Sequence, residues 1–434
     1  MIEQLAALPT YETYKDSGVE WLGEIPAHWK VVPLKYSLSL NSEKISSRNS
    51  TLKYYGMENI ESWSGRFIET ESEVEGLANK FSENDILFGK LRPYLAKVAL
   101  ATCEGICSTE FLVYRAKKQS ANFFKYLLLS TDFINLVDAS TYGSKMPRAN
   151  ADFIGIQRLP IPNLPEQTAI AAFLDRKTAQ IDQAVAIKEQ QIALLKERKQ
   201  ILIQNAVTRG LDPSIPMRDS GVEWIGEVPA HWELLANRAL FRERIEQGEE
   251  GLPLLSVSIH TAVSSEEISD EENIRGRIKI EDKTKYNLVQ PGDIVFNMMR
   301  AWQGAIGAVA VKGMVSPAYI IATPSPKIAS SYFEYQYRCP EFIQQMDRNS
   351  KGITDFRKRL YWNEFKQLMS VVPPIEEQTT IVTHIETQSA KIDQAIAIQQ
   401  QQIDKLKEYK ATLINSAVTG KIKVPELVES QDTA

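Results

Sequence analysis

The chain has 434 residues, 43% of them hydrophobic, with a formal net charge of −5 and a pI near 5.7. This length suits about three domain-sized units, and the acidic balance excludes a uniformly basic chain, so any contact with nucleic acid must come from local patches. Three cysteines are too few for a disulfide framework, and neither a membrane-spanning run nor a secretory leader pattern occurs. We therefore expect a soluble cytoplasmic protein.

The first motif along the chain is a short opening segment that occurs twice. Residues 16–29 read DSGVEWLGEIPAHW and residues 219–232 read DSGVEWIGEVPAHW, with 12 of 14 positions identical. The glycines and the proline indicate a folded turn, and the two tryptophans supply an apolar anchor. His28 and His231 are repeated too, but no nucleophile or carboxylate is repeated beside them in the sequence. We interpret both histidines as packing or capping residues rather than catalytic ones.

Each opening segment is followed by roughly 130 residues of short apolar, β-branched and aromatic runs separated by Gly, Asn and Pro, a pattern typical of strands. The runs are 53–57, 85–88, 97–101 and 111–114 in the first copy and 254–258, 293–296, 305–310 and 318–321 in the second. A helical pattern follows in each copy, over 122–136 and over 332–346, and prolines at 160, 162, 373 and 374 then end the domain. The fold class predicted is α+β, in two copies.

The longest predicted element is a helix over 165–208, and it is also repeated. Residues 181–192 return as 392–403 with 9 of 12 identical, so the chain is a tandem pair of one unit. In the first copy, residues at steps of three or four form one stripe along the helix, about 54 Å long. The residues predicted to pair the two helices are Ile170, Leu174, Ile181, Val185, Ile192, Leu195, Leu202, Ile381, Ile385, Ile392, Ile396, Ile403, Leu406 and Leu413.

A single apolar stripe must be buried, and the closest matching surface is the stripe of the other copy. The polar positions within the stripes are compatible with pairing or with solvated ends; they are Lys177, Lys188 and Lys199 in the first copy and Gln388, Gln399 and Lys410 in the second. The alternative is two separate amphipathic helices, each packed on its own domain. We favour an antiparallel, coiled-coil-like paired-helix spacer.

These motifs together resemble one known family over essentially the whole chain. The opening segments, the linker RGLDP at 209–213, the PxPxxxEQTxI pattern before each helix and the IDQA helices are similar to those of the specificity (S) subunit of type I restriction-modification systems. The resemblance implies two target-recognition domains, each reading one half of a bipartite double-stranded DNA target, with paired helical regions between them. It also implies two modification (M) subunits that carry adenine methyltransferase chemistry, and recruitment of restriction (R) subunits.

On this interpretation the chain has five segments. They are a first target-recognition domain at 1–162, a central helical region at 163–210, a second target-recognition domain at 211–374, a distal helical region at 375–424 and a flexible tail at 425–434. The chain itself is expected to be non-catalytic and to hold no cofactor, with S-adenosylmethionine, ATP and magnesium on the partner subunits. Apolar positions off the main stripe, Leu194, Ile201 and Ile203, suggest faces that need covering by methyltransferase subunits.

DNA readout requires Arg, Lys, Asn or Gln at base edges and phosphates, with aromatic residues for packing. The stretches 85–92 and 293–300 match in frame, and both end in arginine. The candidate DNA-binding residues are Lys90, Arg92, Tyr94, Lys145 and Arg148 in the first copy and Arg300, Trp302, Lys351, Arg357, Lys358 and Arg359 in the second. An arginine kept in both copies could equally hold the fold.

Catalytic interpretations are weaker. Residues 316–319, SPAY, resemble an amino-methyltransferase motif but lack its second proline, and we interpret them as the start of a strand. Residues 281–283, EDK, fit half of a nuclease motif that is common by chance, and no phosphate-binding GxxxxGK loop or metal-ligand constellation occurs. Cys103 and Cys107 are interpreted as core residues. Two other functions stay open, a coiled-coil adaptor that binds only proteins and a self-contained restriction enzyme.

The paired-helix geometry predicts that helix length sets the gap between the half-sites. A stripe of about 54 Å corresponds to a target on the order of 16 base pairs, including its gap. Adding or removing whole helical turns in both helices should therefore change the gap and leave both half-site sequences unchanged, as read by methylome sequencing. If the altered chain kept its original gap, helix length would not set the spacing of the half-sites.

Overall fold

The computed structural model describes residues 8–69, 76–141, 145–222, 225–264, 285–352 and 357–425. The chain divides into two compact units: the first is Met1–Glu189 with Gln399–Ala434, and the second is Gln190–Ile398. Each unit thus contains part of both long helices, α6 (Leu164–Arg209) and α11 (Ile375–Val418). Within the described ranges, none of the helices has the length and hydropathy to cross a bilayer.

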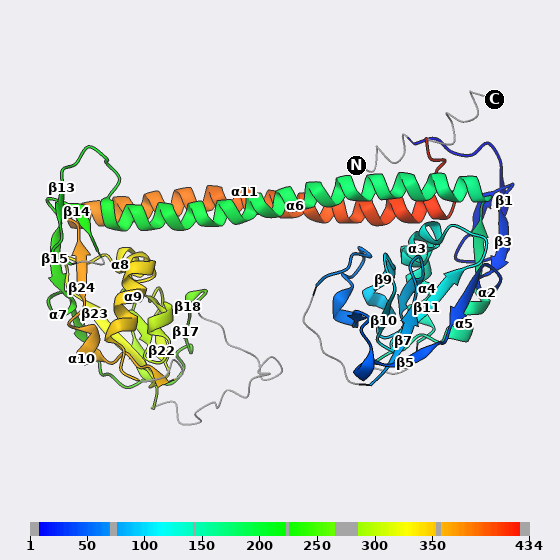
Figure 1. The fold of residues 1–434 in the computed structure, drawn as a ribbon. Coiled ribbons are helices and arrows are strands. Elements are labelled where there is room, and N and C mark those ends of the chain that lie inside the picture. Colours follow the sequence, from blue (N-terminus) through cyan, green and yellow to red (C-terminus); the bar gives the residue numbers. More distant parts are fainter. Residues whose placement is uncertain are drawn as a thin grey trace. The chain divides into compact units, whose positions relative to one another are not determined.

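The first unit is built on two four-stranded sheets (Figure 1). Their orders are β4-β11-β8-β9 and β5-β7-β10-β6, and β6 runs parallel to β10. The strands are β1 (Tyr14–Asp16), β2 (Glu24–Pro26), β3 (Lys30–Pro33), β4 (Leu38–Asn41), β5 (Lys44–Ser46), β6 (Tyr54–Tyr55), β7 (Leu77–Phe81), β8 (Ile86–Gly89), β9 (Val98–Leu100), β10 (Gly105–Cys107), β11 (Phe111–Ala116) and β12 (Arg158–Ile161). The helices before α6 are α2 (Leu34–Ser37), α3 (Ala121–Leu129), α4 (Thr131–Ala139) and α5 (Ala151–Ile156). One apolar core draws on both sheets and includes Phe81, Leu87 and Phe111.

The second unit repeats the sheet β4-β11-β8-β9 of the first unit as β16-β23-β20-β21. Its strands are β13 (Met217–Asp219), β14 (Glu227–Pro229), β15 (Glu233–Ala236), β16 (Phe241–Glu243), β17 (Ser256–Ser258), β18 (Ala262–Ser264), β19 (Asn287–Val289), β20 (Ile294–Asn297), β21 (Ile306–Ala308), β22 (Gly313–Val315), β23 (Tyr319–Pro324) and β24 (Met369–Val372). Its helices before α11 are α7 (Asn237–Leu240), α8 (Ser330–Tyr337), α9 (Pro340–Asn349) and α10 (Trp362–Phe365). The α+β class and the tandem architecture predicted from the sequence are confirmed.

Each single helix predicted before the domain end is in fact two helices. In the first unit, Ser130 leaves the helical backbone with ψ 146° and separates α3 from α4. In the second unit, Pro340 begins α9, because a proline has no N–H for the preceding helix and suits the first helical position. The predictions over 122–136 and 332–346 missed these breaks.

A buried aspartate directly precedes the matching strands β8 and β20 of the two units. Asp85 accepts two hydrogen bonds from the Arg115 guanidinium, at 2.8 and 2.7 Å, and one from the Ser82 backbone N–H. Asp293 is bonded by Arg244 at 2.9 Å and by the Gln290 N–H. Each aspartate stabilises the turn before its strand, and its charge is paired with an arginine. This shared role explains why residues 85–92 and 293–300 match in frame.

The two long helices pair antiparallel. Within the first unit, Lys410 Nζ lies 2.7 Å from Asp182 Oδ1, and Lys188 Nζ lies 3.1 Å from Gln399 Oε1. Within the second unit, Lys199 Nζ lies 2.7 Å from Asp393 Oδ2. The two ion pairs use the same repeat positions with the partners exchanged, because 182 + 211 = 393 and 199 + 211 = 410. The antiparallel spacer is confirmed, and the alternative of two separate helices is wrong.

Most stripe residues are buried and the rest are partly exposed. The buried ones are Ile170, Leu174, Ile181, Val185, Ile192, Ile381, Ile385, Ile392, Ile403 and Leu413. Leu195, Leu202, Ile396 and Leu406 are partly exposed. Off the stripe, Leu194 and Ile201 are 56% and 49% exposed and Ile203 is partly exposed.

The opening segment of the first unit is anchored on the start of α6. The Glu166 carboxylate accepts bonds from Trp29 Nε1 at 2.9 Å and from the Tyr11 hydroxyl at 2.7 Å, and His28 Nε2 lies 3.0 Å away. Burial, with the bond to Glu166, raises the pKa of the Tyr11 hydroxyl far above its ordinary value, so this group stays a donor. The carboxylate partner that the sequence around His28 did not reveal is therefore supplied by the long helix.

The second unit repeats this anchor with fewer bonds. His231 Nε2 lies 2.8 Å from Glu377 Oε2, but buried Trp232 Nε1 has no hydrogen-bond partner among the described residues. Glu223 and Trp224 of the second opening segment lie outside the described residues. The same motif thus holds a better satisfied polar network in the first unit.

This difference predicts unequal costs for the same substitution. Glu166→Ala should lower the free energy of unfolding by about 3 kcal/mol, because it leaves two buried donors without an acceptor. Glu377→Ala should cost about 1 kcal/mol, since it removes one partly exposed pair. Thermal unfolding of both variants measures the difference, and equal losses would contradict it.

Candidate nucleic-acid interface

Two segments of the first unit that were predicted separately as DNA-binding lie side by side. The backbone N–H of Arg92 donates to the Pro147 carbonyl at 2.8 Å, and that of Ala149 donates to the Lys90 carbonyl at 2.8 Å. Leu91 and Arg148 form an isolated antiparallel bridge. The structure therefore joins residues 90–92, which follow β8, to residues 147–149 in one loop pair, which we call the first loop pair.

Arg92, in the first loop pair, combines a strained backbone with an exposed side chain. Its backbone is left-handed, with φ 51° and ψ 66°, a conformation that costs a non-glycine residue roughly 1–2 kcal/mol. The side chain is exposed, and no hydrogen bond or ion pair engages its guanidinium within the described residues. Strained backbone with an unengaged cationic side chain is typical of a binding site rather than of a core.

The other candidates in the first unit differ in availability. Arg148 is held by Glu110, with Nε 3.1 Å from Oε2. Lys145 and Tyr94 are exposed, and Lys90 is partly exposed. The structure adds Met146, 51% exposed between Lys145 and Pro147, which sequence reasoning missed because an apolar residue gives no charge signal.

The second unit has the same arrangement after β20. The Leu360 N–H donates to the Met298 carbonyl at 2.8 Å. We call residues 298–302, together with 351–352 and 357–360, the second loop pair. Lys351 and Arg359 exchange two backbone hydrogen bonds of 2.8 Å. Arg300 occupies the position of Arg92, is exposed, and makes no side-chain bond within the described part of the chain.

The basic cluster at 357–359 is partly engaged inside the protein. Lys358 Nζ lies 2.6 Å from Asp347 and 5.1 Å from the centre of the Trp302 ring. Lys351 Nζ lies 2.5 Å from Glu364. Arg359 Nη1 donates to the Lys358 carbonyl at 2.8 Å, whereas Arg357 is exposed. Three of these cations are therefore held by partners within the protein, so they are not equally available to bind DNA.

Trp302 also serves the loop, since its Nε1 donates to the Met299 carbonyl at 2.9 Å. Two further apolar side chains, Met299 and Tyr361, are exposed beside the cations of the second loop pair. Apolar contact is how a protein recognises the thymine methyl group in the major groove. Each loop pair thus combines an unengaged arginine with exposed apolar side chains.

The structure does not place the alternative catalytic motifs in a catalytic site within the described residues. Tyr319 N–H donates to the Ser316 carbonyl at 2.9 Å, so residues 316–319 form a turn that leads into β23, as predicted. Residues 108–111, at the matching place in the first unit, form the same turn before β11, with Phe111 N–H 3.0 Å from the Ser108 carbonyl. The EDK motif at 281–283 and residues 426–434 of the predicted tail lie outside the described residues. Among the described residues, no three His, Cys, Asp or Glu side chains are grouped so that they could hold a metal ion.

The cysteines are core residues with one exception. Cys107 and Cys339 are buried, and burial raises the pKa of each thiol to about 12. Cys103 is exposed, because it lies in the turn between β9 and β10, so its assignment to the core was wrong.

Comparison with known proteins gives one family. Residues 27–197 match the family model of the "Type I restriction modification DNA specificity domain". The "Type I restriction enzyme EcoDI specificity subunit" of Escherichia coli is 30% identical over 138 residues, which span 29% of this chain and 31% of that protein. The "Putative type I restriction enzyme MjaX specificity subunit" of Methanocaldococcus jannaschii is 22% identical over 436 residues, which span 93% of this chain and 96% of that protein.

Two solved structures share the fold. One is described as "Structural basis underlying complex assembly and conformational transition of the type I R-M system"; it has a TM-score of 0.68 and 16% identity and covers 91% of this chain and 98% of its own. The other is the HsdS subunit of Thermoanaerobacter tengcongensis, with a TM-score of 0.51 and 16% identity, covering 92% of this chain and 98% of its own.

Proposed function

We propose that the chain is a member of the family of type I restriction-modification specificity subunits and reads a bipartite, gapped DNA target, one half with each unit. The observation that carries this proposal is the repeated loop pair, with Arg92 and Arg300 in the same frame. Both guanidiniums are exposed and unengaged within the described residues, whereas Arg115, Arg148 and Arg244 are bound to carboxylates.

An unengaged guanidinium suits base recognition. Its planar fork can donate two parallel hydrogen bonds to O6 and N7 of guanine, the most frequent specific contact in the major groove. Lysine is a point charge and suits phosphates, so Lys90 and Lys145 are assigned to the backbone of the first half-site. Met146 and Met299 are assigned to apolar contact with base edges.

The long helices support a gap between the half-sites. Helix α6 has 46 residues and helix α11 has 44, so α6 is about 69 Å long at the usual rise per residue. Ion pairs between the helices in both units stiffen such a spacer. A stiff spacer fixes the gap, since it cannot shorten without losing paired charges and buried stripe residues.

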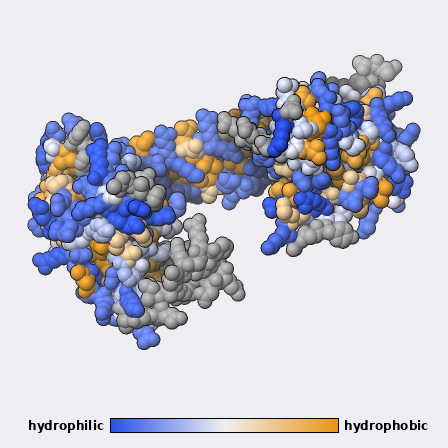
Figure 2. All heavy atoms as spheres, turned by 60° about the horizontal axis from the view of Figure 1, so that its bottom comes forward, coloured by the Kyte–Doolittle hydropathy of each residue, from blue (hydrophilic) through white to orange (hydrophobic). Residues whose placement is uncertain are grey.

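The outer face of α6 supports partner binding. Ile187, Leu194 and Ile201 recur every seven residues and are all about half exposed, and apolar patches interrupt the polar surface of the helices (Figure 2). A heptad of exposed apolar residues suits a helix from another subunit. We assign this face to two modification subunits, which would bring S-adenosylmethionine and the methyltransferase chemistry. The restriction subunits would bring ATP and magnesium, and this chain would stay non-catalytic.

Methylome sequencing of a host expressing this chain with its modification subunit tests the proposal. The expected result is a gapped, two-part motif with N6-methyladenine in each half. If no motif appears while the same modification subunit is active with another specificity subunit, the chain does not direct methylation. A coiled-coil adaptor that binds only proteins would then be the better description.

The frame-matched arginines give a sharper prediction. Arg92→Ala should weaken recognition of one half-site about 10- to 100-fold, and Arg300→Ala should affect only the other, because each loses one bidentate base contact. Arg92→Lys should keep affinity better than specificity, since it retains the charge without the fork.

Arg238→Ala is the matched control, because Arg238 is exposed on α7, outside both loop pairs and outside the long helices. Binding of the assembled complex to DNA with each half-site scrambled in turn provides the measurement. A uniform loss across all sequences in both alanine variants would assign the arginines to phosphates and refute their reading role.

A further inference from the structure

In the first unit, a lysine closes the junction between the end of α11 and the opening segment. Gly420 ends the helix with φ +75°, and the next residue is Lys421. Its Nζ donates to the Leu22 carbonyl at 3.0 Å and to the Glu24 carbonyl at 2.6 Å. A Cβ placed on Gly23 would lie 3.8 Å from this ammonium. The opening segment therefore presents backbone oxygens that bind a primary ammonium group.

In the second unit, the same junction lacks the lysine. Gly210 ends α6 with φ +76°, but the next residue is Leu211, which is 37% exposed. The segment 22–24 corresponds to Ile225, Gly226 and Glu227, at the offset of 203 that relates the two opening segments. No side chain donates to the carbonyls of Ile225 and Glu227 within the described residues, and nothing lies within 4 Å of a Cβ built on Gly226.

A side-chain hydrogen bond next to the junction is repeated in the two units. In the first unit, Asn415 Nδ2 near the end of α11 donates to Asp132 Oδ2 of α4 at 2.7 Å. In the second unit, Gln204, which is 211 positions before Asn415, donates to Glu341 in the first turn of α9. The surrounding framework is thus repeated, and the junctions differ in the residue that follows the glycine and in Arg209, which precedes the glycine only in the second unit.

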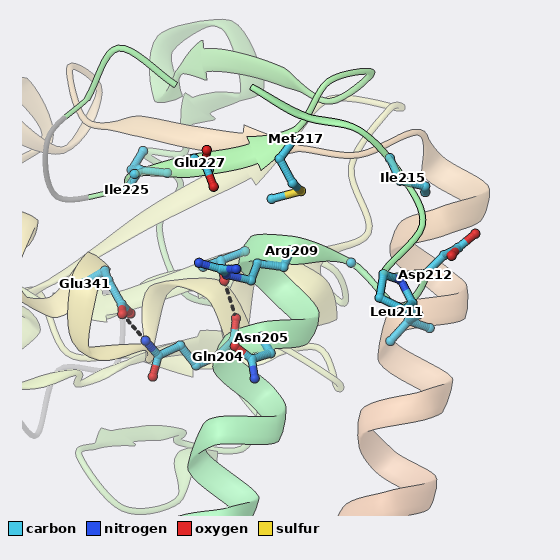
Figure 3. Close-up of a pocket in the computed structure, with 14 residues that line it drawn as sticks. Gln204, Asn205, Arg209, Leu211, Asp212, Ile215, Met217, Ile225, Glu227 and Glu341 are labelled. Carbon is cyan, nitrogen blue, oxygen red and sulfur yellow. Dashed lines mark hydrogen bonds between the residues drawn. The ribbon is translucent and has the colours of Figure 1, made fainter. Parts of the chain in front are cut away.

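A pocket of about 610 Å³ lies at the second junction. Figure 3 shows it between the end of α6, the linker and the strand that carries Glu227, with the Gln204–Glu341 bond at its floor. Asp212, Glu227 and Glu341 contribute carboxylates to its lining, and Ile215 and Met217 contribute apolar surface. Glu341 Oε2 is buried and has no hydrogen-bond partner in the part of the chain that the structure describes.

We propose that this pocket binds a primary ammonium group on an alkyl stem, the group that Lys421 supplies in the first unit. An ammonium has three N–H donors, and Lys421 uses them on the two matching carbonyls of the first unit. Three carboxylates against one guanidinium in the lining favour a cation. The inference rests on the difference between the two junctions and does not depend on DNA recognition.

Arg209 is the internal competitor for the pocket. Helix α6 has this residue between Thr208 and Gly210, whereas Gly420 directly follows Thr419 at the other junction. Figure 3 shows its side chain extending across the pocket, yet its guanidinium makes no hydrogen bond or ion pair within the described residues. It therefore leaves the carbonyls and the Glu341 oxygen without a donor.

Thermal unfolding of the full chain tests the site. n-Butylammonium chloride should raise the midpoint of the wild type by about 2 °C, whereas tetramethylammonium at the same concentration, which has the charge but no N–H, should not. Leu211→Lys should raise the midpoint by itself and abolish the response, because it supplies the ammonium from the chain. No response in the wild type, or the same response in Leu211→Lys, would overturn the proposal.

Two further variants separate the alternatives. Arg209→Gln should keep the response; a response that appears only in this variant would mean that Arg209 fills the site itself and would also overturn the proposal. Lys421→Leu should lower the midpoint and gain a second response to n-butylammonium at the first junction. Failure of that chemical rescue in a folded variant would show that these carbonyls do not select an ammonium.

The ammonium could come from a free alkylamine or from a lysine of a partner subunit. Zero-length carbodiimide cross-linking of the co-purified complex distinguishes the two sources, since it joins a carboxylate only to an amine in direct contact. A partner lysine recovered on Glu341 or Glu227 by mass spectrometry identifies a protein source. Recovery of none, with the n-butylammonium response intact, identifies a free amine.

Discussion

The anchoring of each opening segment on a long helix is the constraint on which the rest of the structure depends. In the first unit, buried Trp29 and Tyr11 both donate to Glu166, and Gly420 at the end of α11 has no room for a side chain, since a Cβ there would lie 2.3 Å from Pro26. One motif thus holds the start of one helix and the end of the other. Because each helix belongs partly to each unit, this arrangement requires the helices to run antiparallel.

Comparison of the two units distinguishes residues that hold the fold from residues that are available for binding. Asp85 and Asp293 keep their place and their burial, although the arginine partner is in β11 in the first unit and directly follows β16 in the second. Arg92 and Arg300 keep their place although their guanidiniums make no hydrogen bond or ion pair within the described residues, so the fold does not use their side-chain charge. The lysines and apolar residues around them differ between the copies, as two loops that contact different bases require.

The sequence repeat allowed the architecture to be predicted, whereas contacts between segments far apart in the sequence could not be predicted. A period of 3.6 over the stripe predicts the long helices, because one apolar face needs a partner. The bond between His28 and Glu166 spans 138 residues, and the joining of Lys90 to Ala149 depends on how a loop turns; neither leaves a local pattern. The helix breaks at Ser130 and Pro340 were missed because continuous apolar periodicity outweighed the local signals of a serine and a proline.

The first unit is built from two segments at opposite ends of the chain, and this has a consequence for synthesis on the ribosome. The second unit is one continuous stretch, Gln190–Ile398, whereas the first needs residues from Gln399 onward. Its contacts include Asp132 with Asn415 and Leu22 with Lys421, pairs separated by 283 and 399 residues. The first unit to be translated is therefore the last to be completed, and its half of α6 waits with an uncovered apolar stripe until the final segment emerges. A chain that stops early loses the fold at its beginning rather than at its end.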